Sequence, residues 1–102
     1  MANDATINPM YIDDDDAAVT TKNVVIQAIA WVSDATAGDD IAADDDFELR
    51  TGSGASASAG TVLISKRAEF AGDDLFVSFP GGLPCEGIYC AALDGGICFI
   101  YS

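Results

Sequence analysis

The chain has 102 residues, half of them apolar, and carries 17 acidic side chains against four basic ones, a formal net charge of −13 with no histidine. This length fits one domain with a modest core. Four cations cannot neutralise the phosphates of a nucleic acid, and an acidic surface repels DNA, RNA and anionic lipid. No stretch approaches the roughly 20 apolar residues that span a bilayer. We therefore expect neither a nucleic acid nor a membrane as partner.

The first 22 residues are polar and rich in aspartate, and Pro9 would interrupt an early helix. They contain no basic region followed by an apolar one, so they do not resemble a secretory signal, and we expect synthesis in the cytoplasm. We expect residues 1–22 to form an extended acidic arm and residues 23–102 to form the domain; a plain disordered tail is the alternative. The candidates for contact with a neighbouring protein are the apolar side chains of the arm: Ile7, Met10, Tyr11 and Ile12.

Strand patterns begin at residue 23. The segment NVVIQAIAWV, residues 23–32, is rich in β-branched side chains and apolar on both alternating faces, which predicts a strand buried on both sides, with Trp31 in the core. FELRT, residues 47–51, alternates with Phe47 and Leu49 inward. A loop of small residues, 52–60, leads to an expected strand at 61–66. The segment 74–79 predicts another, with Phe76 and Ser78 on the face opposite its other apolar residues.

The C-terminal part combines turn residues with apolar runs. PGGLP, residues 80–84, predicts a break in regular structure. Asp94-Gly95 between GIYCAAL and ICFIY predicts a hairpin, because such a tight turn requires a positive φ. Six or seven short strands separated by turns predict an all-β fold: a small single-domain antiparallel β-sandwich or jelly-roll-like barrel with an extended N-terminal arm.

Three cysteines invite a metal or redox interpretation. Cys85, Cys90 and Cys98 lack both the C-x-x-C spacing of redox sites and the paired spacing of structural zinc sites, and no histidine could complete a zinc site. Either register of the expected hairpin places Cys90 and Cys98 too far apart, or on opposite faces, for a disulfide. We expect all three to be small buried hydrophobic residues, without a metal or another cofactor.

The carboxylates raise the questions of catalysis and of calcium. They lie in runs typical of solvated loops, and Ser-His and Cys-His nucleophiles are impossible without histidine, so we expect no catalytic residues and no enzyme. Loop carboxylates can also supply oxygen ligands to Ca²⁺. The favoured interpretation is still that they solvate the surface, because the EF-hand spacing is missing. The calcium candidates are Asp39, Asp40, Asp44, Asp45 and Asp46.

Three stretches together resemble a known family: VVIQAIAWV after an Asp-rich arm, FELRTGSGASASAGTVLI, and the closing FPGGLPCEGIYCAALDGGICFIY. In residues 23–102 the chain resembles the small β-sandwich proteins of tailed bacteriophages that serve as capsid decoration (cement) proteins or other minor virion components. The extreme acidity departs from the less charged members of this family. The resemblance implies a β-sandwich that adds contacts to an assembled shell and has no turnover.

The resemblance implies the major capsid protein as partner and the capsid exterior of the virion, after synthesis in the host bacterium, as location. A charge of −13 fits the outside of a shell, because packaged DNA would repel it inside. Self-association into a dimer or trimer would suit a symmetric shell. Other functions stay open: a tail, adaptor or fibre-base protein of the same virion, and a receptor- or glycan-binding β module. A calcium-dependent secreted module is a third.

Overall fold

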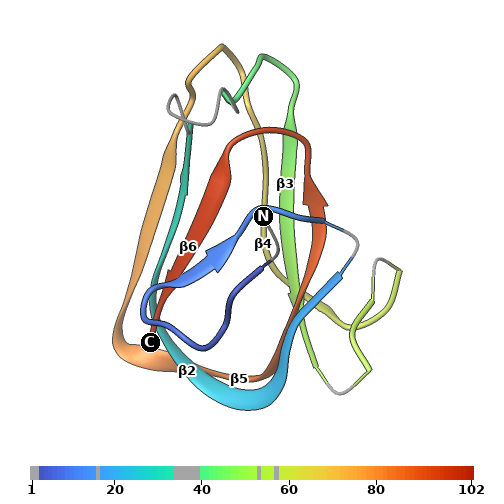
Figure 1. Cartoon of the computed structure of the whole chain (residues 1–102), viewed down its shortest axis with the longest axis vertical. Helices are drawn as coiled ribbons and strands as arrows, with labels where there is room; N and C mark the ends of the chain where they lie inside the picture. Colours follow the sequence, from blue (N-terminus) through green and yellow to red (C-terminus); the bar gives the residue numbers. More distant parts are fainter. Residues whose placement is uncertain (1–2, 16, 34–39, 53, 57) are drawn as a thin grey trace.

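The computed structural model describes residues 3–15, 17–33, 40–52, 54–56 and 58–102, and these residues contain strands and no helix. The protein is therefore an all-β domain, as the sequence predicts. No helix among them is long and apolar enough to cross a membrane. The six strands are β1 (Met10–Ile12), β2 (Ala17–Val32), β3 (Asp46–Thr51), β4 (Thr61–Arg67), β5 (Leu75–Leu93) and β6 (Ile97–Tyr101) (Figure 1).

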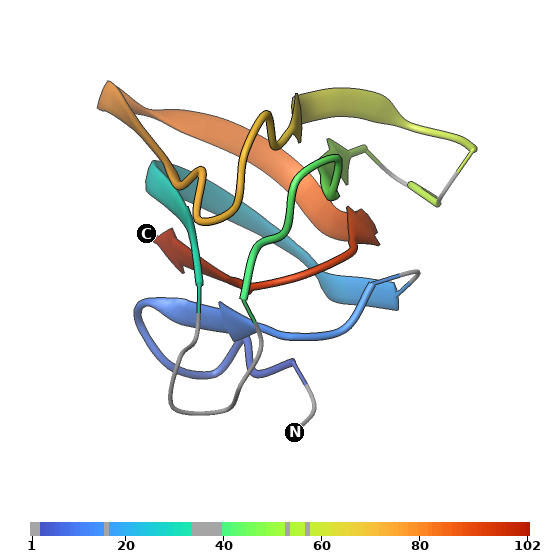
Figure 2. The same cartoon turned by 90° about the horizontal axis from the view of Figure 1, so that it is seen from above.

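All six strands belong to one antiparallel sheet with the order β1-β6-β2-β5-β3-β4. Figure 2 shows β1, β6, β2 and β5 following one another from the bottom to the top of the view. The sheet folds over into two layers, and the two long strands, β2 and β5, each take part in both of them. The second half of β2 pairs with β6 and with the beginning of β5, whereas its first half pairs with the later part of β5, which also holds β3.

A large bulge in the β2–β5 pair separates these two layers. Ile26 pairs with Leu83 and Ala28 with Ser78, so residues 79–82 of β5 stand opposite Gln27 alone. The expected break at 80–84 is thus a bulge inside a continuous strand. The bulge also changes which side chains of β2 point inward, because Ile26 faces the core before it and Ile29 and Trp31 after it. This change of face explains why residues 23–32 are apolar on both faces.

The N-terminal segment packs on the domain itself. β1 pairs with β6, and Met10 and Ile12 are buried in the core with 5% and 0% of their surface exposed. β2 begins at Ala17, six residues before the expected strand, and it continues across the boundary expected at residues 22–23. Burial of two large apolar side chains accounts for the docking of β1, since each such burial is worth about 1.5–3 kcal/mol.

The expected C-terminal hairpin does not form. The last part of β5 pairs with β3 and with the beginning of β2, and β6 pairs with β1 and with the end of β2. Residues 94–96 therefore connect one layer of the fold to the other. The indole Nε1 of Trp31 donates a hydrogen bond to the carbonyl oxygen of Gly95 at 2.9 Å, which ties this connection to the core. The chain bends at residues 94–96 with its positive φ at Gly96, one residue beyond the predicted pair, and the predicted hairpin pairing was wrong.

The core lies between the layers, and its packing follows the expected alternation in β3. Phe47 and Leu49 are fully buried, and the Phe47 ring stacks on Trp31 with 5.2 Å between ring centroids. The fully buried large side chains come from several strands and from the loop before β3: Trp31, Phe47, Ile12, Ile26, Ile29, Ile41, Leu49, Ile88 and Ile100.

Candidate docking surface

The three thiols are free and buried among these apolar side chains. Cys98 stands directly opposite Trp31 and Ile12 on the neighbouring strands, and Cys90 stands opposite Leu49. Burial raises the pKa of the Cys90 thiol to about 12, and the charge of Asp15 adds to the effect. Burial likewise raises the pKa of Cys98 well above its usual value. A thiol that stays protonated at neutral pH is a poor nucleophile and a poor metal ligand.

The calcium candidates are spread over a loop and the start of β3. Asp40 and Asp44 are exposed, while a carboxylate oxygen of Asp45 accepts a hydrogen bond from the backbone N–H of Ala42 at 2.8 Å. Asp46 pairs with a cation, and Asp39 lies outside the described residues. In the part of the chain that the structure describes, no three acidic, cysteine or histidine side chains are grouped to hold a metal ion.

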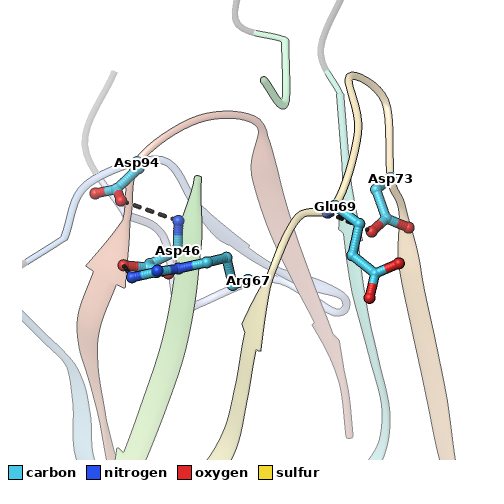
Figure 3. Close-up of polar contacts among 5 residues, drawn as sticks. All are labelled: Asp46, Arg67, Glu69, Asp73 and Asp94. Atoms are coloured by element: carbon cyan, nitrogen blue, oxygen red, sulfur yellow. Dashed lines mark hydrogen bonds and ion pairs between the residues drawn. The ribbon is translucent and has the colours of Figure 1, made fainter. Parts of the chain in front are cut away.

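Among the described residues, three cations form ion pairs within the chain, and Figure 3 shows one of these pairs, Arg67 with Asp46. The pairs are Arg50–Glu48 at 2.7 Å, Lys66–Asp73 at 3.0 Å and Arg67–Asp46 at 2.8 Å. The hydrogen bond from Arg67 lowers the pKa of the Asp46 carboxyl. The hydrogen bond from the backbone N–H of Glu69 lowers the pKa of the Asp73 carboxyl, and the bond from Lys66 has a smaller effect in the same direction. All three cations lie on β3 and β4, so this end of the sheet is close to neutral while the remainder of the chain is strongly acidic.

Two of the surface hollows are lined by strands β2 and β5 and by the loop after β3. One, of about 370 Å³, is lined by residues of β2 and β5 around Val25 and Pro84, and the other, of about 340 Å³, lies between β2 and the loop after β3. Their volumes are at the lower limit for small-molecule pockets. Their only charged lining residue is Glu86, and neither lining contains an acid paired with a base.

A row of aromatic side chains crosses the outer face of the layer formed by β1, β6, β2 and β5. Tyr11 lies directly opposite Phe99, Phe99 opposite Ala30, and Ala30 opposite Phe76. Directly opposite residues of an antiparallel pair share a face. Tyr11 and Phe99 also meet edge to face, with 5.8 Å between ring centroids. This row points away from the core that Trp31 and its neighbours fill.

The register adds two further rows to the same face. In one, Tyr101 of β6 lies opposite Ala28 of β2, which lies opposite Ser78 of β5. We call the whole set the aromatic face: Tyr11, Ala28, Ala30, Val32, Phe76, Ser78, Ile97, Phe99 and Tyr101. None of these nine residues is charged in a chain whose net charge is −13.

The aromatic face is partly open to solvent. Phe76 exposes 66% of its surface and Tyr101 exposes 38%, whereas Ala28 and Ala30 are nearly covered by the larger side chains that flank them. Continuous exposed apolar surface on a soluble protein commonly marks a site of protein contact. Aromatic side chains gain the most from such contacts, because they bury a large area with few rotatable bonds. This surface offers apolar contact area to a partner.

Of the four apolar side chains of the N-terminal arm that were expected to contact a neighbouring protein, two lie in the core and two do not. Met10 and Ile12 face the protein's own core, so their assignment to a neighbour's surface is corrected here. Ile7 is exposed, and Tyr11 belongs to the aromatic face. Phe76 was expected on the face opposite Leu75 and Val77, but no pattern in the sequence connects it with Phe99 and Tyr11.

No family model, curated protein sequence or solved structure matches this chain.

Proposed function

We propose that this protein is a non-enzymatic structural component of a bacteriophage virion, namely a decoration (cement) protein that binds the outer surface of the capsid shell and stabilises it. The observation that carries the proposal is the uncharged aromatic face on a chain of charge −13. The resemblance of residues 23–102 to decoration proteins supplies the kind of partner, the major capsid protein.

The distribution of charge supports the same function. An apolar face can adhere to a protein surface without requiring opposite charges, because burial of apolar area is favourable by about 25 cal/mol per Å². The acidic loops elsewhere on the chain then keep decorated particles apart in solution. A face repeated many times around a shell also gains avidity, so that a modest contact in each copy is sufficient.

The test is the binding of the purified protein to empty shells of the phage that carries its gene. We expect the protein to sediment with the shells and to raise the temperature at which they dissociate. Tyr101→Glu places a charge on the aromatic face at an exposed position and is expected to weaken binding at least about tenfold. Val62→Glu is the matched control, because Val62 is 45% exposed but lies on β4, away from this face.

Failure of the wild-type protein to bind shells would refute the proposal. Association with isolated tails instead of shells would favour the tail or adaptor alternative. Exposed aromatic side chains such as Phe76 are also the groups that sugar rings stack on, so a glycan array is a second useful measurement. A glycan signal that disappears in a Phe76→Ala variant, without binding to shells, would favour the glycan-binding module.

A further inference from the structure

The beginning of β5 forms an open edge of the sheet. Leu75, Phe76, Val77 and Ser78 pair with β2 on one side, and β3 joins β5 only from Tyr89 onward. Among the described strands none pairs with the other side of residues 75–79, and this part of β5, drawn in orange, forms the left margin of Figure 1. A one-sided strand presents a line of backbone N–H and C=O groups to any further strand.

The other open edges carry features that hinder pairing. β4 contains Lys66 and Arg67 and has Leu63 as an extra residue in its register. The outer side of β2 near its beginning carries Lys22 and two register shifts. β1 is only three residues long. Residues 75–79, LFVSF, have neither charge nor proline, and they include the highly exposed Phe76. Natural proteins rarely leave such an edge unprotected unless something covers it.

We propose that a second copy of this chain covers this edge by antiparallel pairing of residues 75–79 about a two-fold axis at Val77. The pairing places Leu75 opposite Phe79 of the second copy, and Phe76 opposite Ser78 of the second copy. Every directly opposed pair within the segment is uncharged. Isologous pairing of this kind closes after two copies, so it yields a dimer rather than a fibre.

The distribution of charge permits a second copy at this edge. Two chains of charge −13 repel each other, and at physiological salt this repulsion is felt over about 8 Å. In the proposed register Asp74 lies opposite Pro80 of the second copy, and Asp73 lies opposite Gly81, so no two carboxylates face each other. The Asp73 carboxylate is also paired with Lys66 at 3.0 Å. Residues 75–79 are thus a part of the surface where two copies can approach with little repulsion.

The pairing would join the aromatic faces of the two copies. Directly opposed residues share a face, so Phe76 and Ser78 of the second copy point to the same side of the sheet. The row Tyr11, Phe99, Ala30, Phe76 then continues into the second copy through its Ser78, Ala28 and Tyr101. A shell-binding dimer would dock through two such faces at once, although the dimer itself does not depend on the proposed function.

Sedimentation equilibrium of the purified full chain, without shells, tests the dimer. We expect a monomer–dimer equilibrium that strengthens from low to high NaCl, because salt screens the repulsion between the copies. Phe76→Glu should weaken the dimer at least about tenfold. Val62→Glu makes the same change of charge at an exposed position on the β4 edge and should leave the dimer unchanged. A monomer at every concentration and salt, or equal effects of the two variants, would overturn the proposal.

Cross-linking tests the register. Phe76→Cys and Ser78→Cys chains are mixed and oxidised, and the products are separated by mass. Directly opposed Cβ atoms lie about 4.5–5.5 Å apart and diagonal ones about 7–8 Å, whereas a disulfide needs about 3.5–4.5 Å. We expect the mixed disulfide to predominate, because positions 76 and 78 of the two copies are directly opposed. The native thiols are buried and should not compete. Equally efficient cross-linking of Ser78→Cys with itself would show a different axis and overturn the register.

Tyr101→Glu, which lies off this edge, should dimerise normally, so loss of shell binding and loss of the dimer are separable.

Discussion

Gly96 shows how a single residue controls the connection between β5 and β6. Its φ is +74°, and a Cβ atom there would lie 2.5 Å from the carbonyl oxygen of Val32 and 2.7 Å from Cγ1 of Ile41. Both the backbone conformation and the space therefore require glycine. The close approach lets residues 94–96 lie against the end of β2, where the carbonyl of Gly95 receives the Trp31 indole hydrogen bond.

Gly96→Ala should lower the free energy of unfolding by about 1–2 kcal/mol for the left-handed conformation, and by about 1–3 kcal/mol more for the steric overlap. Urea unfolding at neutral pH measures the change. Gly72→Ala is the control, because Gly72 has a φ of +78° with open space at the Cβ position and should lose only the first part. Equal losses in the two variants would contradict the close approach at Gly96.

The buried thiols predict a loss of stability at alkaline pH. The unfolded chain releases its thiol protons near pH 9, whereas the folded Cys90 keeps its proton until about pH 12. Because the folded pKa is raised, the stabilisation is complete below pH 9 and declines as pH rises, by about 1.4 kcal/mol per pH unit for each such thiol. Urea unfolding across this range should therefore give a steeper decline for the wild type than for Cys90→Ala. Parallel profiles would mean that the thiol ionises equally in both states.

At the scale of elements, β1 makes the N-terminal segment part of the domain. Ile12 is fully buried beside Cys98, and its removal leaves a cavity in the core. Ile12→Ala should therefore lower the free energy of unfolding by about 2–5 kcal/mol. Ile7→Ala, at a position with 52% exposure, should change it by less than about 0.5 kcal/mol. Chemical denaturation of both variants checks this, and a near-neutral Ile12→Ala would show that β1 is not docked in solution.

The strand boundaries show which local sequence patterns were sufficient to predict a strand. The alternation at Phe47 and Leu49 predicted β3 within a residue, because one face of that strand is buried and the other is not. The same rule could not place the bulge at Gln27, because residues 79–82, which form its other half, lie 52 residues further along the chain. The aromatic face was missed for the same reason, since Phe76 and Phe99 become neighbours only through Ala30.

At the scale of the whole molecule, the charge of −13 works against the compact state. Among the described residues three ion pairs engage Arg50, Lys66 and Arg67, and the 17 acidic side chains of the sequence far outnumber its four cations. Self-repulsion of this kind destabilises a folded chain and is screened by salt. We expect the melting temperature of a Phe76→Glu variant to rise between 0.05 and 0.5 M NaCl, a range over which the Debye length falls about threefold. This variant separates the effect of charge from that of dimerisation. A fall would show that the ion pairs contribute more than the repulsion opposes.

The sequence by itself determined the all-β class, most of the strands, the burial of Trp31 and the cysteines, and the acidic surface. These properties depend on side chains within a few positions of one another and on total composition. Only the tertiary structure decided which strands pair. A hairpin between β5 and β6 and the observed pairing of β6 with β1 and β2 both satisfy the backbone, and the difference lies in burying Ile12, Cys98 and Ile100 together. That choice, made by contacts far apart in the chain, also created the aromatic face and left the edge of β5 open.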